Sequence, residues 1–214
     1  MIPISLTKRL TCATCLRAKS MCICQWITPT VHKVEVVILQ HPQEVTNVKG
    51  SARLLHLSLP LSRLVAGEVF DPLSLQELLT TPRPTSSVIP KHTILLYPDL
   101  PHDMVPGVAP PPVLTQGWLQ DTSQLRLIVI DGTWRKSRKI LYKNPLLQAI
   151  PRLSLRDMPA SQYLIRKAHR TDQLSTLEAT CAALMQLEGN VAQFMPLLAA
   201  FDGFVAQLSR RLPG

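Results

Sequence analysis

Long apolar runs, a secretory leader and an even balance of charge are all missing from this chain of 214 residues. No apolar stretch approaches membrane-spanning length, because charge, proline or polar residues interrupt each candidate. Residues 1–10 lack the apolar core of a signal peptide. Acidic residues number 14 against 23 basic ones, and the formal net charge of +9 favours a polyanionic partner such as a nucleic acid. We therefore expect a soluble, cytoplasmic protein without a membrane partner.

Cysteine is scarce outside one short segment. Four of the five cysteines follow a C-x-x-C and then a C-x-C spacing, and they are Cys12, Cys15, Cys22 and Cys24. Four thiolates in one loop are the ligand set of a closed, tetrahedral, structural Zn²⁺ site. Two disulfides are the alternative, but they would require an oxidising compartment. The fifth, Cys181, falls in an apolar helical pattern and is expected to be a small buried side chain.

Basic residues surround this cysteine cluster: Lys8, Arg9, Arg17 and Lys19. With the net charge, they favour an RNA-handling module over a redox centre. We predict a small zinc-binding knuckle over residues 1–30, followed by a single larger domain over residues 31–214.

Short β-branched runs alternate with helical patterns through the larger domain, which is typical of an α/β fold with a mostly parallel sheet flanked by helices. The 46% apolar content is sufficient for one packed core. We expect an irregular, proline-rich connection over residues 100–112. Strands are predicted at 34–39, 64–70, 93–97 and 125–130, and helices at about 48–57, 73–80, 134–142, 175–188 and 191–208.

The turn after the fourth predicted strand, Asp131-Gly132-Thr133-Trp134, is the most unusual of the strand ends, where α/β proteins place their chemistry. It combines a carboxylate, a glycine that permits close backbone approach, and a threonine suited to capping a helix. One interpretation is that Asp131 and Thr133 cap a solvated helix. The other is a functional carboxylate beside a basic ridge, since cations early in a helix oppose its dipole. The ridge consists of Arg135, Lys136, Arg138, Lys139 and Lys143.

This turn resembles the D-x-T-W signature of the DTW-domain family, the tRNA-uridine aminocarboxypropyltransferases. The rest of the family's motifs follow in order along nearly the whole chain: the four cysteines, His41-Pro42-x-Glu44, Leu95-Leu96-Tyr97-Pro98, Ser161-x-Tyr163-x-Ile165-Arg166 and Ser175-Thr176-Leu177-Glu178. One departure is Ala18, where the family pattern has proline, and it concerns the stiffness of the zinc loop.

The resemblance implies transfer of the 3-amino-3-carboxypropyl group of S-adenosylmethionine to N3 of a uridine in the tRNA variable loop, giving acp3U and methylthioadenosine. It also implies a SPOUT-like fold with a C-terminal knot over residues 31–214, which no sequence pattern could have proposed. The partners are then tRNA and S-adenosylmethionine, while a monomer and a homodimer both stay open. The alternatives are a knotted RNA methyltransferase and a non-catalytic, zinc-containing RNA-binding protein.

Asp131, Thr133 and Trp134 are the catalytic candidates. The uridine N3 must lose a proton, and Asp131 is the candidate base; binding the donor's amino group is its alternative role. A base that works near neutral pH requires desolvation of Asp131, which we expect Trp134 to provide.

The resemblance also suggests donor and RNA contacts, several of which have structural alternatives. Ser175 and Glu178 form a capping-box pattern, His41 can make a structural hydrogen bond, and Tyr97 can be a packing residue. The donor candidates are Leu96, Tyr97, Pro98, Ser161, Tyr163, Arg166, Ser175, Thr176, Glu178, His41 and Glu44. The phosphate candidates are Arg17, Lys19, Arg135, Arg138 and Lys139, with Trp26 available to stack on a base.

Overall fold

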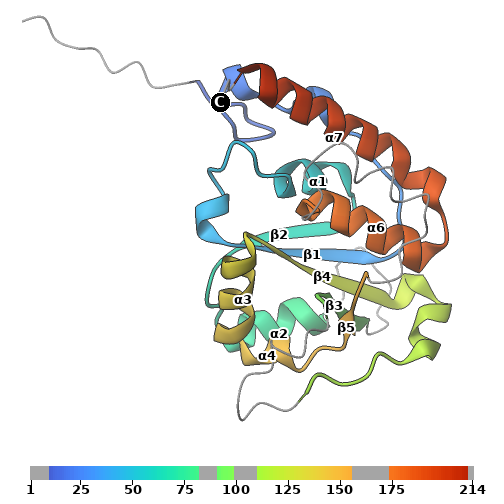
Figure 1. Cartoon of the computed structure of the whole chain (residues 1–214). Coiled ribbons are helices and arrows are strands. Elements are labelled where there is room, and N and C mark those ends of the chain that lie inside the picture. The colour runs from blue at the N-terminus through green and yellow to red at the C-terminus, as the bar shows by residue number, and fades with distance from the viewer. Residues whose placement is uncertain (1–9, 82–90, 99–109, 156–173, 212–214) are drawn as a thin grey trace, which may run out of the picture.

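Five parallel strands form one sheet at the centre of the molecule, in the order β2-β1-β4-β3-β5 (Figure 1). The computed structural model describes residues 10–81, 91–98, 110–155 and 174–211. The two central strands, β1 and β4, are buried along their whole length. The prediction of a parallel α/β sheet is confirmed. The strands are β1 (Glu35–Gln40), β2 (Ser62–Ala66), β3 (His92–Leu96), β4 (Leu125–Asp131) and β5 (Arg152–Leu153).

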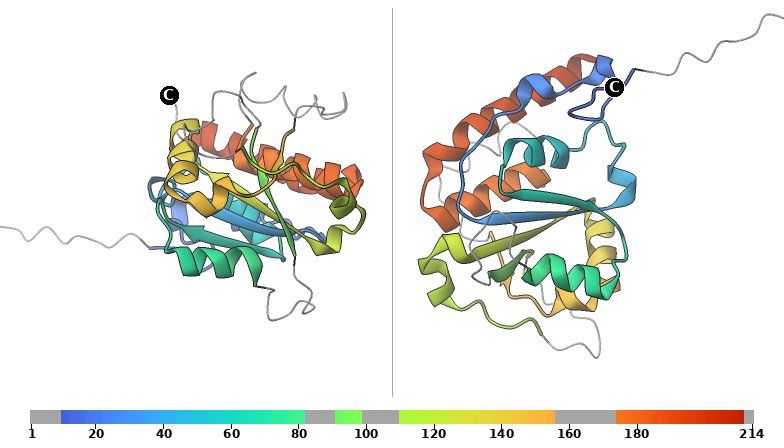
Figure 2. Two further views of the ribbon diagram at one scale, coloured as in Figure 1. Left: turned by 90° about the horizontal axis from the view of Figure 1, so that it is seen from below. Right: turned by 180° about the vertical axis from the view of Figure 1, so that it is seen from behind.

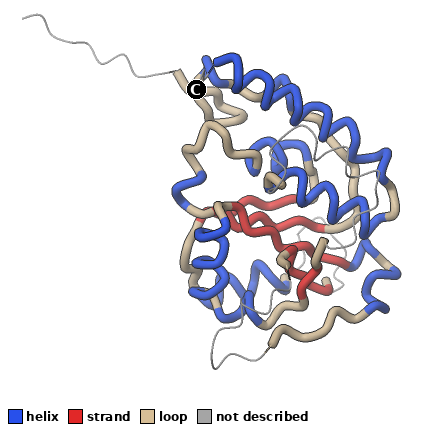
Figure 3. The backbone as a smooth tube through the Cα atoms, in the orientation of Figure 1, coloured by secondary structure: helices blue, strands red, loops and turns tan. Residues whose placement is uncertain are grey.

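Helices cover both faces of this sheet (Figures 2 and 3). One face packs against α1 (Ala52–Ser58), α6 (Thr176–Glu188) and α7 (Val191–Arg211). The other packs against α2 (Pro72–Thr80), α3 (Trp134–Lys143) and α4 (Pro145–Gln148). Short 3-10 helices lie in the connections: η1 (Lys19–Met21), η2 (Cys24–Trp26), η3 (Pro42–Glu44), η5 (Gln116–Gln120) and η6 (Thr122–Gln124).

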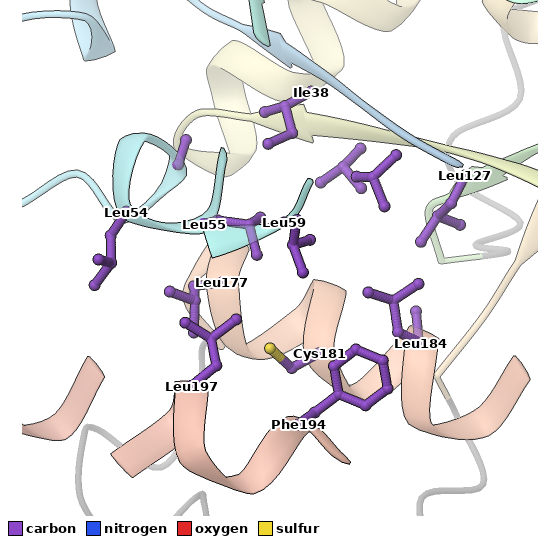
Figure 4. Packing of buried hydrophobic residues seen from close by; sticks show 14 of the residues in the cluster. Ile38, Leu54, Leu55, Leu59, Leu127, Leu177, Cys181, Leu184, Phe194 and Leu197 are labelled. Carbon is purple, nitrogen blue, oxygen red and sulfur yellow. The ribbon is translucent and has the colours of Figure 1, made fainter. Parts of the chain in front are cut away.

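Successive side chains along each strand point to opposite faces of the sheet, which explains why there are two hydrophobic cores. In β1, Val36 and Ile38 face α1, α6 and α7, whereas Val37 and Leu39 face α2, α3 and α4. Figure 4 shows the first core, in which Cys181 packs near Phe194. Cys181 is fully buried, as its sequence context predicts.

Most predicted elements lie within two residues of the observed ones, and the differences have local causes. The second strand ends early, because the chain leaves the sheet after Gly67 donates to the Gln40 carbonyl at 2.9 Å. The first helix begins only at Ala52, because a turn closed by Gly50 N–H and the Asn47 carbonyl precedes it. Both β5 and α4 were missed, since two and four residues carry no measurable periodicity.

Helix α7 differs from the expectation that no segment reaches membrane-spanning length. By length and composition alone, residues 191–210 could cross a membrane. A core helix passes the same test, and α7 buries Phe194, Leu197, Phe201 and Phe204 in the first core. The segment that contains η2 runs along α7 (Figures 1 and 2).

Candidate functional site

Asp131 lies at the carboxyl end of β4, where it meets residues from two other elements. Its side chain accepts a hydrogen bond from the Thr176 hydroxyl at 2.6 Å and another from the Gln40 amide at 2.9 Å. Gln40 ends β1 and is the register partner of Asp131, while Thr176 is the first residue of α6. The carboxylate is only 5% exposed, so both oxygens are held in place with little access to bulk water.

Burial raises the pKa of Asp131, and the nearby negative charge of Glu44 raises it further. Hydrogen bonds from Thr176 and Gln40, and the positive charge of Lys136, act in the opposite direction without cancelling the effect. The desolvation predicted for a general base is therefore present. The aromatic ring of Trp134, which we expected to provide it, stacks on Tyr97 with centroids 5.2 Å apart.

The capping interpretation of the Asp131 turn is wrong. Thr133 occupies the N-cap position of α3 with an extended backbone, but its side chain makes no capping hydrogen bond. The Asp131 oxygens accept from Gln40 and Thr176 instead. The polar residues of this turn are therefore not explained by helix capping.

The basic ridge of α3 is partly tied to acidic side chains on neighbouring loops. Lys136 pairs with Glu44 at 2.7 Å, while Lys139 and Lys143 pair with Glu68 at 2.8 and 2.7 Å. Hydrogen bonds from Lys139, Lys143 and then His41 lower the pKa of Glu68 to about 2. The ridge therefore anchors α3 to the loops after β1 and β2.

The two remaining phosphate candidates on α3 differ in their contacts. Arg135 is exposed. The Arg138 guanidinium lies over the Tyr142 ring, 5.5 Å from its centroid, and donates to the Tyr142 hydroxyl at 3.0 Å. Arg135 therefore presents its charge most openly to a polyanion.

His41 and Glu44 make structural contacts in the turn after β1. The Gln43 N–H donates to His41 Nδ1 at 3.2 Å, so Nε2 carries the proton toward Glu68, 3.0 Å away. Glu44 ends η3, and its carboxylate accepts from Lys136 and from the Asn47 amide at 2.6 Å. Although burial raises it, these hydrogen bonds leave the pKa of Glu44 below its usual value.

The capping box predicted at the start of α6 is confirmed. The Glu178 carboxylate accepts from Ser175 N–H at 2.8 Å, and Glu178 N–H donates to the Ser175 hydroxyl at 3.2 Å. Leu177 N–H has no acceptor within the helix, because it lies in the first turn, and it donates to the Ser51 hydroxyl at 3.2 Å. These contacts fix the first turn of α6 and so hold Thr176 against Asp131.

Tyr97 follows β3 and is sandwiched between two side chains. The Trp134 ring stacks on it at an interplanar angle of 19°, and the Arg152 guanidinium lies 5.2 Å from its centroid. Tyr97 is 3% exposed, whereas Trp134 is 42% exposed. Leu96 packs against the first core, and Pro98 accepts a weak hydrogen bond from Arg152 at 3.5 Å. The donor candidates Ser161, Tyr163 and Arg166 lie outside the described residues.

The four N-terminal cysteines converge as the sequence predicts. Their sulfur atoms all lie within 4.8 Å of one another, and none of them is in a disulfide. A tetrahedral Zn²⁺ with bonds of about 2.3 Å places its sulfurs about 3.8 Å apart. The Cys12–Cys24 and Cys15–Cys22 distances of 3.5 and 3.8 Å fit this geometry. The donor set therefore suits a structural zinc ion.

Arg17 and Trp26 make internal contacts beside the zinc loop. Arg17 donates to the carbonyls of Val48 at 2.6 Å and Gly50 at 2.7 Å, and its guanidinium lies over the Phe204 ring. The Trp26 indole N–H donates to Gln207 at 2.5 Å, and its ring covers Gly203 of α7. Both side chains, predicted as RNA contacts, thus have structural partners.

A groove of about 390 Å³ separates the zinc loop from the segment that follows β1. It is lined by residues from the ranges 15–21 and 44–53, together with Gln40 and Leu64. Two of the lining side chains, Gln40 and Glu44, also influence Asp131.

Sequence reasoning missed two members of this site. Gln40 was visible only as a polar residue at the end of a buried apolar strand, and its pairing with Asp131 depends on strand order. Ser51 gave no local signal for its bond to Leu177, because the two residues are far apart in the sequence.

Comparison with known proteins agrees with this arrangement of motifs. A model of the DTW domain matches residues 9–209. The chain is 30% identical over 188 residues to tRNA-uridine aminocarboxypropyltransferase 2 of Mus musculus. The matched region covers 86% of this chain and 58% of that protein. For the protein of the same name from Macaca fascicularis, identity is 30% over 195 residues, with coverage of 88% and 60%.

The relative of that name from Drosophila melanogaster is 29% identical over 189 residues, with coverage of 85% of this chain and 68% of that protein. The chain thus spans about three-fifths of the length of the two mammalian relatives. No solved structure matches it. Because the domain model covers nearly all of the residues, including the buried Asp131 and the four converging cysteines, the chain belongs to the DTW-domain family.

Proposed function

We propose that this protein transfers the 3-amino-3-carboxypropyl group of S-adenosylmethionine to N3 of a uridine in tRNA, in the variable loop, and releases methylthioadenosine. The observation that carries the proposal is the buried Asp131 of the D-x-T-W signature, held between Gln40 and Thr176. The relatives' names, which describe tRNA-uridine aminocarboxypropyltransferases, support the same substrate class.

Asp131 is the general base in this proposal. Burial raises its pKa, which makes the carboxylate a stronger base than an ordinary aspartate, and each oxygen keeps a lone pair beyond the hydrogen bond that it accepts. The proton of N3 moves to Asp131, the bond from N3 to the γ-carbon forms, and the carbon–sulfur bond breaks. Its electron pair returns to the sulfonium sulfur, so the leaving group is a neutral thioether.

We propose that the donor lies beside Tyr97 and Pro98, which follow β3 and form one wall of its site. Ser161, Tyr163 and Arg166 are proposed from their sequence motif as further donor contacts. An arginine there can grip the donor's carboxylate with two parallel hydrogen bonds. The chemistry depends on which carbon of the sulfonium lies in line with N3, so this wall determines transfer of the propyl arm over the methyl group.

The zinc ion is proposed to be structural. Four thiolates fill its coordination sphere, which leaves no position for water or substrate. It would hold the loop that presents Lys19 toward tRNA, while Arg135 contacts phosphate from α3. Removing zinc with a chelator should therefore unfold this loop and weaken tRNA binding, measured as faster amide exchange in residues 10–24 and a higher Kd.

The proposal extends to the fold and location expected from the sequence. We infer a SPOUT-like knot in the domain over residues 31–214 and a cytoplasmic location, with a monomer and a homodimer both compatible. The oligomeric state is measured by light scattering with and without tRNA.

The proposed reaction is tested by the mass of its product. Unmodified tRNA is incubated with S-adenosylmethionine and the protein, digested to nucleosides and weighed, while methylthioadenosine is assayed in parallel. We expect one uridine to gain an aminocarboxypropyl group, with an equal amount of methylthioadenosine. A methylated nucleoside with S-adenosylhomocysteine would instead identify a methyltransferase, and tRNA binding without any product would identify a non-catalytic RNA-binding protein.

A further inference from the structure

The geometry points to Arg17 as a positioning residue: we infer that it couples the zinc loop to the Glu44–Lys136 pair beside Asp131. This role rests on the proposed function only for its kinetic effect, because the coupling itself is a property of the folded chain. It replaces the role in phosphate binding that the sequence suggests for Arg17.

Arg17 joins the zinc loop to Val48 and Gly50, which lie 31 and 33 residues further along the chain. Its two terminal nitrogens donate to the carbonyls of Val48 and Gly50, at 2.6 and 2.7 Å. The guanidinium also lies over Phe204 of α7, 5.1 Å from the ring centroid. A planar fork with several donors can bridge two carbonyls and stack on a ring at once, which a lysine ammonium cannot do in this geometry.

The segment that Arg17 holds continues into the site through short contacts. Gly50 N–H donates to the Asn47 carbonyl at 3.0 Å, and the Asn47 amide donates to Glu44 at 2.6 Å. Glu44 in turn pairs with Lys136 at 2.7 Å. Each link is a direct hydrogen bond or ion pair, so loosening Arg17 should release the segment that orients Glu44.

A second path reaches Asp131 from the same segment. Ser51, directly after Gly50, accepts a hydrogen bond from Leu177 N–H at the start of α6. The preceding residue, Thr176, donates to Asp131 at 2.6 Å. Arg17 therefore holds the segment that contacts both Glu44, the charge beside Asp131, and the first turn of α6, which carries the donor Thr176.

Lys19 is the matched control. It has the same charge, lies two residues away in the same loop and is exposed, whereas Arg17 is half-buried. If Arg17 positions the segment, only its substitution should loosen residues 44–51. If both residues bind phosphate, the two substitutions should act alike.

The first test compares Arg17→Ala, Arg17→Lys and Lys19→Ala by hydrogen exchange of the amides in residues 44–51, by zinc content and by the salt dependence of tRNA binding. We expect both Arg17 variants to exchange about tenfold faster or more in this segment while each keeps its zinc. Arg17→Lys should leave the salt slope unchanged, whereas Lys19→Ala should reduce the slope by about one. Wild-type exchange in Arg17→Lys, with a reduced slope in Arg17→Ala, would overturn the inference.

The second test separates positioning from a merely structural role by the pH dependence of the rate. Among the described residues, the charged groups that shift the pKa of Asp131 are Glu44 and Lys136, whereas its hydrogen-bond donors Gln40 and Thr176 are neutral. Displacing Glu44 removes a negative charge and frees Lys136, and both changes lower the pKa of Asp131. We expect the acid limb of kcat to move to lower pH in Arg17→Ala and in Glu44→Gln.

Asn47→Ala breaks the same path without touching the zinc loop, so it serves if the Arg17 variants fold poorly. It should reproduce the shifted acid limb with normal zinc content, and an unshifted limb in all three variants would refute the coupling. If the wild-type protein forms no product, the proposed function fails, yet the exchange and salt measurements still decide the role of Arg17.

Discussion

Each end of the β1–β4 strand pair holds a buried carboxylate, but the two carboxylates have different hydrogen-bond donors. At the start of the pair, Glu35 lies opposite Arg126, which donates two hydrogen bonds to one of its oxygens at 3.1 and 2.8 Å. At the end, Asp131 lies opposite Gln40, and its donors are neutral. A guanidinium pairs with the first carboxylate, whereas neutral donors orient the second, whose pKa is raised by burial.

The start of the pair is also tied to other elements. Arg126 is fully buried and donates to the carbonyls of Leu78 and Thr81 at the end of α2, at 3.0 and 2.8 Å. Lys91 lies 3.8 Å from the other Glu35 oxygen. No corresponding cation pairs directly with Asp131 among the described residues, where Lys136 is held by Glu44. The same two strands therefore hold one carboxylate that is paired with cations and one, the proposed base, that is held by neutral donors.

Replacing the reactive carboxylate should have the largest effect. Asp131→Asn keeps the size of the side chain but replaces one of its two accepting oxygens with an NH2 donor, and it cannot accept the N3 proton. We expect kcat to fall by about 10² to 10⁴ fold, with little change in tRNA affinity. The measurement is methylthioadenosine release under single-turnover conditions. A selective loss of donor affinity, with the rate at saturation preserved, would instead make Asp131 a ligand of the donor's amino group.

The same variant tests the desolvation of Asp131 through stability. A raised pKa means that the folded protein retains the proton to higher pH than the unfolded chain, so stability is lost as pH rises from about 4 through the folded pKa. Asp131→Asn does not ionise and escapes this loss. The difference between the free energies of unfolding of the variant and the wild type, measured by urea titration, should therefore shift in favour of the variant as pH rises across this window. A constant difference would contradict the raised pKa.

Breaking the structural carboxylate pair should cost stability instead of chemistry. Arg126→Met removes both hydrogen bonds to the buried Glu35 and leaves it only the more distant Lys91, 3.8 Å away, so we expect a loss of about 3 to 5 kcal/mol in the free energy of unfolding. The double variant Glu35→Leu/Arg126→Met removes both charges and should recover most of that loss. If the double variant is as unstable as the single one, the hydrogen bonds of Arg126 to the α2 carbonyls outweigh its pairing with Glu35.

Removing one neutral donor should have a smaller effect on the reactive end. Thr176→Val deletes the hydroxyl that donates to Asp131, and this hydrogen bond lowers the pKa of Asp131. The acid limb of the rate should therefore move to higher pH, and the rate below that limb should fall by about tenfold. Thr176→Ser keeps the hydroxyl and should behave like the wild type. Equal effects of the two variants would show that the methyl group matters more than the hydrogen bond.

The smallest expected effect concerns the zinc loop. Ala18 has φ of −51°, close to the value that proline imposes, and the neighbouring ladder bonds use the N–H groups of Cys12 and Lys19. Ala18→Pro should therefore stabilise the zinc-loaded protein by about 0.4 to 1 kcal/mol without altering the rate. Thermal unfolding of the zinc-loaded protein measures it, and a loss of stability would show that the loop needs the freedom of alanine.

Local patterns explain which parts of this structure were predictable. The buried strands, the capping box at Ser175 and the cysteine cluster are each encoded within a few neighbouring residues. The two-residue strand β5 carries no such pattern. The proposed function rests on the order of several motifs along the chain, because no single residue type or spacing specifies an aminocarboxypropyl transfer.

The rest depends on contacts between distant segments. Gln40 meets Asp131 only because β1 and β4 are neighbours in the sheet, although 91 residues separate them. Arg17 looks like any exposed cation in the sequence, and only the folded loop shows that it binds two carbonyls. A charge near a cysteine cluster therefore does not predict whether the side chain faces RNA or the protein.

The role of Asp131 as the base is tested by the rate of methylthioadenosine formation on tRNA as a function of pH, in the wild type and in Asp131→Asn. We expect the wild-type rate to fall on the acid side of a single titration, with an apparent pKa above the ordinary aspartate value of about 3.9. In Asp131→Asn this limb should vanish and the remaining rate should rise with hydroxide. A wild-type acid limb that persists unchanged in Asp131→Asn would contradict the assignment of the base to the neutral-donor end of the strand pair.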